Sequence, residues 1–101
     1  MPEYRLTAPA LRDITGILDY LTTEASPAIA ERTEDKLFEL FEVLARNPGI
    51  GHRRQDITSR DVRFHPLRPY MVVYEPGAQP IMIHGVLHSS RDVRRILDAR
   101  L

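Results

Sequence analysis

Two amphipathic helical segments follow one another near the start of the sequence, and only a few residues separate them. Apolar side chains recur at helical spacing in residues 8–23 and again in residues 27–46, where acidic side chains occupy much of the remaining surface. Thr7 and Ser26 stand at N-cap positions, each followed closely by a proline that suits a first helical turn. Because so short a link places helices side by side, we expect an antiparallel helical hairpin with one apolar face to bury.

The sequence also indicates where the second helix ends and where the first helix departs from the usual helix-forming residues. Asn47-Pro48-Gly49 ends the second helix, since proline cannot continue a helix and glycine suits the turn that follows one. Gly16 lies inside the first helix, where glycine costs about 1 kcal/mol relative to alanine. This glycine indicates either close packing at its position or a weak helix.

The second half of the chain has the pattern of β-strands. Residues 62–65 alternate polar and apolar side chains, whereas residues 70–75 and 81–88 are apolar and rich in strand-forming residue types. Pro76-Gly77 forms a turn, and short connections between strands predict antiparallel neighbours. Residues 3–6 form a further short strand at the start of the chain.

Residues 49–61 are polar and glycine-containing, which predicts a loop. Residues 92–97 predict a short C-terminal helix, capped by Ser89 or Ser90. The order β-α-α-β-β-β-α then predicts a single α+β domain over residues 1–101, with the helical hairpin packed on one face of an antiparallel sheet.

Several classes of protein are excluded by composition. The chain has no cysteine, which rules out disulfides and thiolate metal sites. No apolar stretch approaches the ~18 residues that span a bilayer, and Met1-Pro2-Glu3-Tyr4-Arg5 lacks the pattern of a secretory signal. No glycine-rich phosphate loop and no Ser-His-Asp arrangement is present.

The formal net charge of zero hides an asymmetry between the two halves of the chain. Residues 1–50 hold five Lys and Arg against nine Asp and Glu, and residues 51–101 hold nine Arg against five Asp and Glu. The basic half could face nucleic acid or an acidic protein, or the two halves could attract each other within the fold. Thirteen of the fourteen Lys and Arg residues are Arg, which holds its charge and does not transfer protons readily.

Five segments, in order along the chain, resemble the RelE/ParE toxin superfamily, and its ParE branch more closely. They are the opening strand and helix with Tyr4-Arg5-Leu6-Thr7 and Ala10-Leu11-Arg12-Asp13-Ile14, the helix-ending turn Leu44-Ala45-Arg46-Asn47-Pro48-Gly49-Ile50-Gly51, the loop with Asp56 and Val62-Arg63, the central strand Tyr70-Met71-Val72-Val73-Tyr74, and the final Val86-Leu87-His88-Ser89-Ser90-Arg91-Asp92.

The resemblance implies a cytoplasmic toxin of a type II toxin–antitoxin system, neutralised by a ParD-like antitoxin in a hetero-oligomer. ParE-type toxins inhibit DNA gyrase, whereas RelE-type toxins cleave messenger RNA in the ribosome, and a shared fold does not decide between them. We expect the gyrase inhibitor, acting without a cofactor, a membrane or direct nucleic-acid binding. The alternative is a ribosome-dependent mRNA endonuclease.

RNA cleavage would require a base, an acid and cations for the phosphate. By the resemblance, the RNase residues would be His88, Arg63, Arg53 and Arg91; His52, His65, Tyr70 and Arg54 are further candidates. The predicted loop and strands contain no Lys, and the chain as a whole has a formal net charge of zero. Both observations favour the gyrase inhibitor over the endonuclease.

His88 could instead bond a backbone carbonyl at the end of its strand. His84 is expected on the same sheet face as His88, and Tyr70 on the same face as Tyr74. Two histidines without a third ligand predict no metal site.

Two sets of contact residues complete the sequence-based expectations. For the target they are the basic residues Arg53, Arg54, Arg63, Arg91, Arg94 and Arg95, while Arg91 and Asp92 could instead form an ion pair or a helix cap. For the antitoxin they are the apolar residues Leu11, Ile14, Leu18, Leu37 and Phe41, with the acidic face of residues 31–42 attracting basic groups and a strand possible at a sheet edge.

Overall fold

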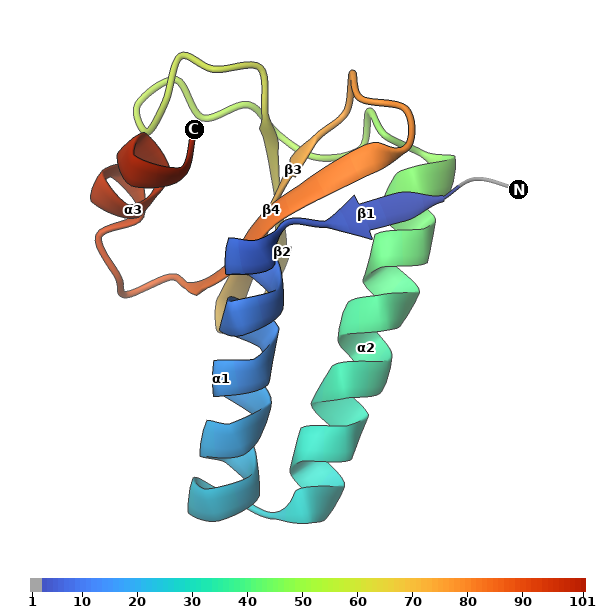
Figure 1. Cartoon of the computed structure of the whole chain (residues 1–101), viewed down its shortest axis with the longest axis vertical. Helices are drawn as coiled ribbons and strands as arrows, with labels where there is room; N and C mark the ends of the chain where they lie inside the picture. Colours follow the sequence, from blue (N-terminus) through green and yellow to red (C-terminus); the bar gives the residue numbers. More distant parts are fainter. Residues whose placement is uncertain (1–2) are drawn as a thin grey trace.

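A computed structural model describes residues 3–101 and has a helical hairpin, a four-stranded sheet and a short C-terminal helix (Figure 1). The elements are β1 (Tyr4–Leu6), α1 (Ala8–Glu24), α2 (Pro27–Arg46), β2 (Arg63–Leu67), β3 (Tyr70–Glu75), β4 (Ile81–His88) and α3 (Val93–Arg100). This order confirms the predicted α+β class, while residues 1–2 of the predicted 1–101 domain lie outside the described part of the chain.

The caps of the hairpin helices are those that the sequence predicts. The Thr7 hydroxyl accepts a hydrogen bond from the first turn of α1 at 3.2 Å, and the Ser26 hydroxyl accepts one from the first turn of α2 at 3.1 Å. The cap of α3 differs from the prediction. Asp92 rather than Ser89 or Ser90 occupies the N-cap, because its carboxylate accepts the backbone N–H three residues later at 3.2 Å.

The sheet has the strand order β1-β4-β3-β2. Strands β2, β3 and β4 are antiparallel neighbours, as their short connections predict, but β1 runs parallel to β4. The predicted antiparallel sheet is therefore a mixed one. The whole helical hairpin separates β1 from β2, so no tight turn fixes the direction of β1 relative to the rest of the sheet.

A β-bulge in β4 changes which side chains share a face of the sheet. Val73 lies opposite Gly85, and the next residue of β3 lies opposite Ile83, which leaves His84 as the extra residue. Ile83 and Val86 consequently join the same buried cluster although they are three residues apart. His84 and His88 then lie on opposite faces, so the prediction that they share a face is wrong.

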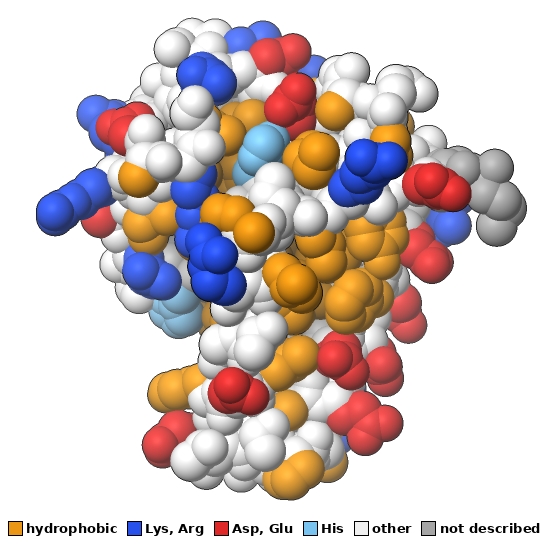
Figure 2. All heavy atoms as spheres, viewed as in Figure 1, with side chains coloured by type: hydrophobic (Ala, Val, Ile, Leu, Met, Phe, Trp, Pro, Cys, Tyr) orange, Lys and Arg blue, Asp and Glu red, His pale blue; other side chains and the backbone are white. Residues whose placement is uncertain are grey.

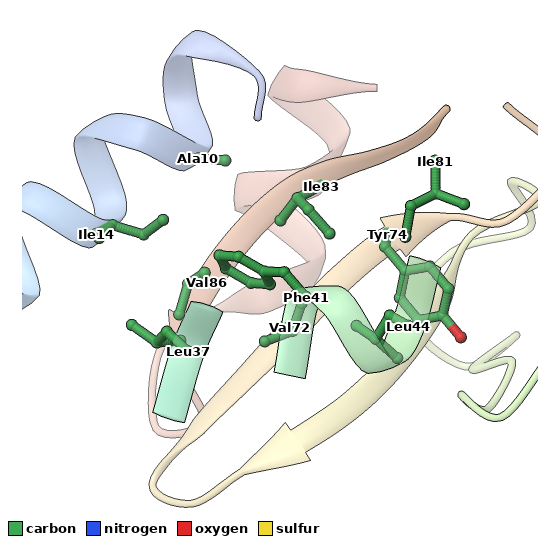
Figure 3. Close-up of a cluster of buried hydrophobic side chains, with 10 residues drawn as sticks. All are labelled: Ala10, Ile14, Leu37, Phe41, Leu44, Val72, Tyr74, Ile81, Ile83 and Val86. Carbon is green, nitrogen blue, oxygen red and sulfur yellow. The ribbon is translucent and has the colours of Figure 1, made fainter. Parts of the chain in front are cut away.

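Two buried clusters cover the two faces of the sheet. Figure 3 shows the larger one, formed between the hairpin and the sheet by Ala10, Ile14, Leu37, Phe41, Leu44, Val72, Tyr74, Ile81, Ile83 and Val86. The smaller one, between the sheet and α3, contains Val62, Phe64, Val73, Leu87, Val93 and Leu97. The C-terminal helix is therefore part of the core and not an appendage.

The predicted loop between α2 and β2 is held to the sheet at its start. The buried Tyr74 hydroxyl accepts the Gly51 N–H at 2.9 Å and donates to the Pro48 carbonyl at 2.7 Å. Any side chain at Gly51 would collide with this hydroxyl, since a Cβ there would lie 2.5 Å from it. His52 then pairs with Phe64 on the outer edge of β2, which occupies part of that edge.

Candidate functional site

An open groove of about 570 Å³ runs between α1 and the end of the sheet where β3 begins and β4 ends. We call it the α1 groove and define it by the residues that line it: Arg12, Asp13, Gly16, Ile17, Tyr20, Leu21, Pro69, Tyr70, Val86, His88 and Arg91. Its exposed surface is more apolar than polar, and its size lies within the range of about 300–1,000 Å³ usual for ligand sites.

His88 lies in this groove at the end of β4, opposite Tyr70 on β3. The two rings meet edge to face, with centroids 5.7 Å apart. The Ser90 backbone N–H donates to Nδ1 of His88 at 3.1 Å, and the Ser90 hydroxyl lies 2.7 Å from the same nitrogen. With Nδ1 as an acceptor, the proton of the neutral ring is carried by Nε2. Burial raises the pKa of the Tyr70 hydroxyl, and the nearby Tyr20 adds to this shift.

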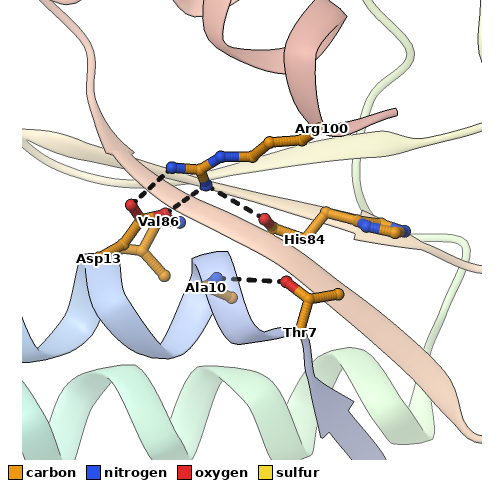
Figure 4. A network of polar contacts seen from close by, with 6 residues as sticks. All are labelled: Thr7, Ala10, Asp13, His84, Val86 and Arg100. Atoms are coloured by element: carbon orange, nitrogen blue, oxygen red, sulfur yellow. Dashed lines mark hydrogen bonds and ion pairs between the residues drawn. The ribbon is translucent and has the colours of Figure 1, made fainter.

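Asp13 borders the groove and connects α1 to the C-terminal helix (Figure 4). Its carboxylate accepts two hydrogen bonds from the Arg100 guanidinium, at 2.6 and 2.8 Å, and one from the Val86 N–H at 3.0 Å. Arg100 also donates to the His84 carbonyl at 3.2 Å. The hydrogen bond to Asp13 raises the pKa of Arg100 above its ordinary value.

This ion pair takes the place of a neighbouring strand. Strand β1 ends opposite Ile83, so the next residues of β4 have no strand on that side. The carboxylate of Asp13 accepts the Val86 N–H, and the guanidinium of Arg100 donates to the His84 C=O. These are the backbone groups of β4 that a longer β1 would otherwise bond. Gly85 makes this possible, because a Cβ there would lie 2.8 Å from the guanidinium.

Charge is distributed unevenly over the surface. Acidic side chains line the α2 side of the molecule, and basic side chains gather on the side where α3 lies (Figure 2). Among residues 3–101, two arginines form ion pairs with carboxylates, Arg54 with Asp56 and Arg100 with Asp13, and only the second pair joins the acidic and basic halves of the sequence. Attraction between the halves therefore accounts for little of the asymmetry, and most of the charge faces solvent.

The sequence matches the family model described as the ParE toxin of the type II toxin–antitoxin system parDE, over residues 4–93. The chain belongs to this ParE toxin family. The match runs from β1 through the N-terminal end of α3 and so covers nearly the whole domain.

A solved structure from the chromosomal ParDE toxin–antitoxin system of P. aeruginosa has the same fold. The superposition has a TM-score of 0.72 at 20% sequence identity, and it covers 87% of this chain and 96% of the other. A search among curated proteins found no match. As a ParE-family protein, the chain is the toxin of a type II toxin–antitoxin system.

The four residues expected to serve an RNase do not converge in this ParE-family chain. Arg63 lies opposite Tyr74 and His88 opposite Tyr70, which places them about 13 Å apart along β3 at ~3.3 Å per residue. Arg63 donates to the Gly51 carbonyl at 3.0 Å and holds the loop, although its buried Nε has no partner among residues 3–101. Only His88 and Arg91 share the α1 groove.

The residues expected to meet the target have different surroundings. Arg53, Arg91 and Arg95 are exposed. Arg54 is exposed and forms a two-pronged pair with Asp56, which lowers the pKa of that carboxylate. Arg94, also exposed, donates to the backbone carbonyl of the same aspartate. Arg63 is half-buried and therefore offers less of its side chain to a partner than the other five do.

The residues expected to bind the antitoxin need correction. Ile14, Leu37 and Phe41 are 3%, 0% and 0% exposed, so they cannot form a contact surface in this fold. The apolar stripe that marks a helix from its sequence is the stripe that faces the protein's own sheet. Leu11 is 53% exposed and Leu18 is half-buried, so these two side chains remain available to a partner.

Among residues 3–101, no group of three His, Cys, Asp or Glu side chains comes together as possible ligands. His84 bonds Glu75 at 3.0 Å on one face of the sheet, and His88 lies on the other. Neither the α1 groove nor the Asp13–Arg100 pair is predicted by the sequence pattern. Only Gly16 gave a signal for the groove, and nothing local in the sequence gave one for the pair.

Proposed function

We propose that this ParE toxin inhibits DNA gyrase and that a ParD-like antitoxin holds it inactive in the cytoplasm. The family match over residues 4–93 carries the proposal, because it favours the ParE branch over the RelE branch across almost the entire domain. The helices described in residues 3–101 include none long and apolar enough to cross a bilayer.

The basic surface supports a partner-binding mechanism. Arg91, Arg94 and Arg95 lie at or near the start of α3 and are exposed, and Arg53 and Arg54 lie in the exposed loop before β2. Guanidinium groups bind carboxylates and phosphates as fixed charged forks but do not exchange protons near neutral pH. An arginine-rich surface therefore suits a toxin that binds gyrase better than one that cleaves a bond.

The separation of Arg63 from His88 also supports inhibition rather than RNA cleavage. Arg63 on β2 and His88 on β4 lie beside opposite ends of β3, so His88 could not reach a phosphate that Arg63 holds. An endonuclease would need its base and its phosphate ligands within hydrogen-bonding distance of a single phosphodiester.

A supercoiling assay with a parallel RNA assay tests the proposal. Purified toxin, free of antitoxin, is added to gyrase, ATP and relaxed plasmid, and separately to ribosomes carrying a messenger RNA. We expect loss of supercoiling or accumulation of linear plasmid, with the RNA intact. Normal supercoiling together with RNA cut at the ribosome would overturn the proposal in favour of the endonuclease.

Charge reversal tests the contact surface better than truncation does. Deleting residues 91–101 would remove Val93 and Leu97 from the core, so a loss of toxicity could reflect unfolding. The double change Arg94→Glu and Arg95→Glu keeps these core side chains. We expect it to weaken inhibition of gyrase about 10-fold or more, while the matched change Arg5→Glu and Arg32→Glu leaves inhibition intact.

A further inference from the structure

The C-terminal helix covers only part of the outer face of the sheet, which is the face opposite the helical hairpin. The sheet-side residues buried there with α3 are Val62, Phe64, Val73 and Leu87. Nearer to the β2–β3 turn, Pro66 lies opposite Met71 on the same face. Because Pro66 is exposed and Met71 is half-buried, the apolar surface continues beyond the part that α3 covers.

A pocket of about 330 Å³ lies in this uncovered part of the sheet. Backbone hydrogen bonds hold its walls in place. His52 exchanges two of them with Phe64, at 2.8 and 2.7 Å, and the Ser89 N–H donates to the Pro69 carbonyl at 3.0 Å. The pocket is therefore formed within the chain itself, as binding sites usually are. We call it the sheet-end pocket and define it by six of its lining residues: His52, Arg54, Pro66, Arg68, Pro69 and Met71.

The rim of the sheet-end pocket is cationic, and its described lining contains no Asp or Glu. Arg68 is exposed and has no carboxylate within 4.0 Å in residues 3–101. Arg54 bonds Asp56 through Nε and one terminal nitrogen, which leaves its other terminal nitrogen for a partner. A partner that fits this pocket presents carboxylates around an apolar side chain.

We propose that the sheet-end pocket binds an acidic segment of gyrase, which places an apolar side chain on Pro66 and Met71 and its carboxylates against Arg54 and Arg68. The proposal rests on the gyrase inhibition proposed above and assigns it a contact site. An apolar anchor surrounded by polar contacts is the usual form of a strong protein–protein contact. Methionine suits such a floor, because its flexible side chain adapts to the group that enters.

A protein segment fits this pocket better than a nucleic acid does. Bases bind such surfaces by stacking on exposed aromatic rings. Phe64, which lines the pocket, is 2% exposed, and the Tyr70 ring packs against His88 on the other face of the sheet. The floor offers proline and methionine side chains instead, which suit an apolar protein side chain.

The location of the pocket separates it from the expected antitoxin contacts. Leu11 and Leu18 lie on the helical hairpin, and the hairpin packs on the opposite face of the sheet. Changes in the sheet-end pocket should therefore weaken gyrase inhibition and leave antitoxin binding as it is.

Two variants and their controls test the proposal in a supercoiling assay with gyrase holoenzyme, ATP and relaxed plasmid. Met71→Glu places a negative charge on the floor, and Met82→Glu makes the same change at a half-buried methionine of β4 outside the lining. Arg68→Glu reverses a charge at the rim, and Arg32→Glu does so at an exposed position of α2. Thermal unfolding verifies that each variant folds, and titration calorimetry measures its affinity for the antitoxin.

We expect Met71→Glu and Arg68→Glu each to raise the toxin concentration for half-inhibition about 10-fold or more, with both controls within about threefold of wild type. Antitoxin affinity should stay within about threefold of wild type in all four variants. If Met71→Glu does not fold, the exposed Arg68→Glu decides the question alone. Wild-type inhibition by the folded pocket variants would overturn the pocket while leaving gyrase inhibition intact.

Three other outcomes would also overturn the proposal, and each has a distinct meaning. Wild-type toxin that does not inhibit gyrase would refute the proposed function itself. Pocket variants that lose antitoxin binding together with inhibition would show that the surface is not specific to gyrase. Linear plasmid DNA that binds wild-type toxin without gyrase, and does not bind the pocket variants, would make the occupant a nucleic acid.

Discussion

Replacing Arg100 by Met should destabilise the protein strongly, because Arg100 closes an ion pair that is largely shielded from solvent. The side chains of Arg100 and Asp13 are 18% and 9% exposed, and their two hydrogen bonds measure 2.6 and 2.8 Å. In the variant, Asp13 keeps only the Val86 N–H as a partner and is left as a shielded, uncompensated charge. The His84 carbonyl loses a donor as well.

The size of the effect follows from this burial. Removing one partner of a fully buried ion pair costs about 3–5 kcal/mol. Because Arg100 and Asp13 keep some contact with water, we expect a loss of about 2–3 kcal/mol in the free energy of unfolding. For a domain of ~100 residues, this corresponds to a fall in Tm of about 10–20 °C.

Urea unfolding followed by circular dichroism measures the loss. Arg95→Met is the matched control, since Arg95 is exposed on the same helix, and it should stay within about 0.5 kcal/mol of wild type. The double variant Asp13→Asn with Arg100→Met should lose less than the two single variants add up to. An Arg100→Met protein within about 0.5 kcal/mol of wild type would refute the reasoning.

Four further changes follow from the same structure. Gly85→Ala should loosen the same ion pair, since its Cβ would lie 2.8 Å from the guanidinium, and wild-type stability in urea would contradict this. Tyr74→Phe leaves the Gly51 N–H without its acceptor and should cost about 1–3 kcal/mol in urea unfolding; a loss under about 0.5 kcal/mol would argue against a role for the hydroxyl. Burial raises the pKa of Tyr74 above 10.0, so the folded state holds this proton more tightly than the unfolded state does. Wild type should therefore lose more stability than Tyr74→Phe as the pH rises from about 9 to about 11. Equal losses in the two proteins would speak against the raised pKa. Asp92→Ala removes the cap of α3 and should cost about 1 kcal/mol in thermal unfolding, whereas Ser89→Ala should cost little; the reverse order would restore the sequence-based assignment.

Local sequence signals predicted most of the fold because the elements carry strong start and stop residues. Ser26 and Asn47-Pro48-Gly49 fix both ends of α2, and the observed bounds agree with the prediction. The apolar runs at residues 70–75 and 81–88 likewise match β3 and β4 residue for residue.

Three features that depend on contacts between distant parts of the chain were not predicted. The bulge in β4 places His84 on the opposite face of the sheet from His88. A single extra residue in a strand leaves no local sequence pattern that would predict it. The parallel direction of β1 depends on how the whole hairpin crosses the sheet, and the Asp13–Arg100 pair joins residues from opposite ends of the chain.

The candidate site was the least predictable part. Helical periodicity predicted the apolar stripe of each hairpin helix. It does not distinguish a stripe that binds a partner from one that packs on the protein's own sheet, as Ile14, Leu37 and Phe41 do. The α1 groove draws its lining from three separate parts of the chain. Gly16 marked one wall of it, as a helix position that local propensity does not favour.

The supercoiling activity of gyrase, measured against increasing concentrations of the antitoxin-free toxin, tests the central claim most directly. A dose-dependent loss of supercoiling that the antitoxin reverses is the predicted result. Full supercoiling at every toxin concentration that arrests growth would contradict it.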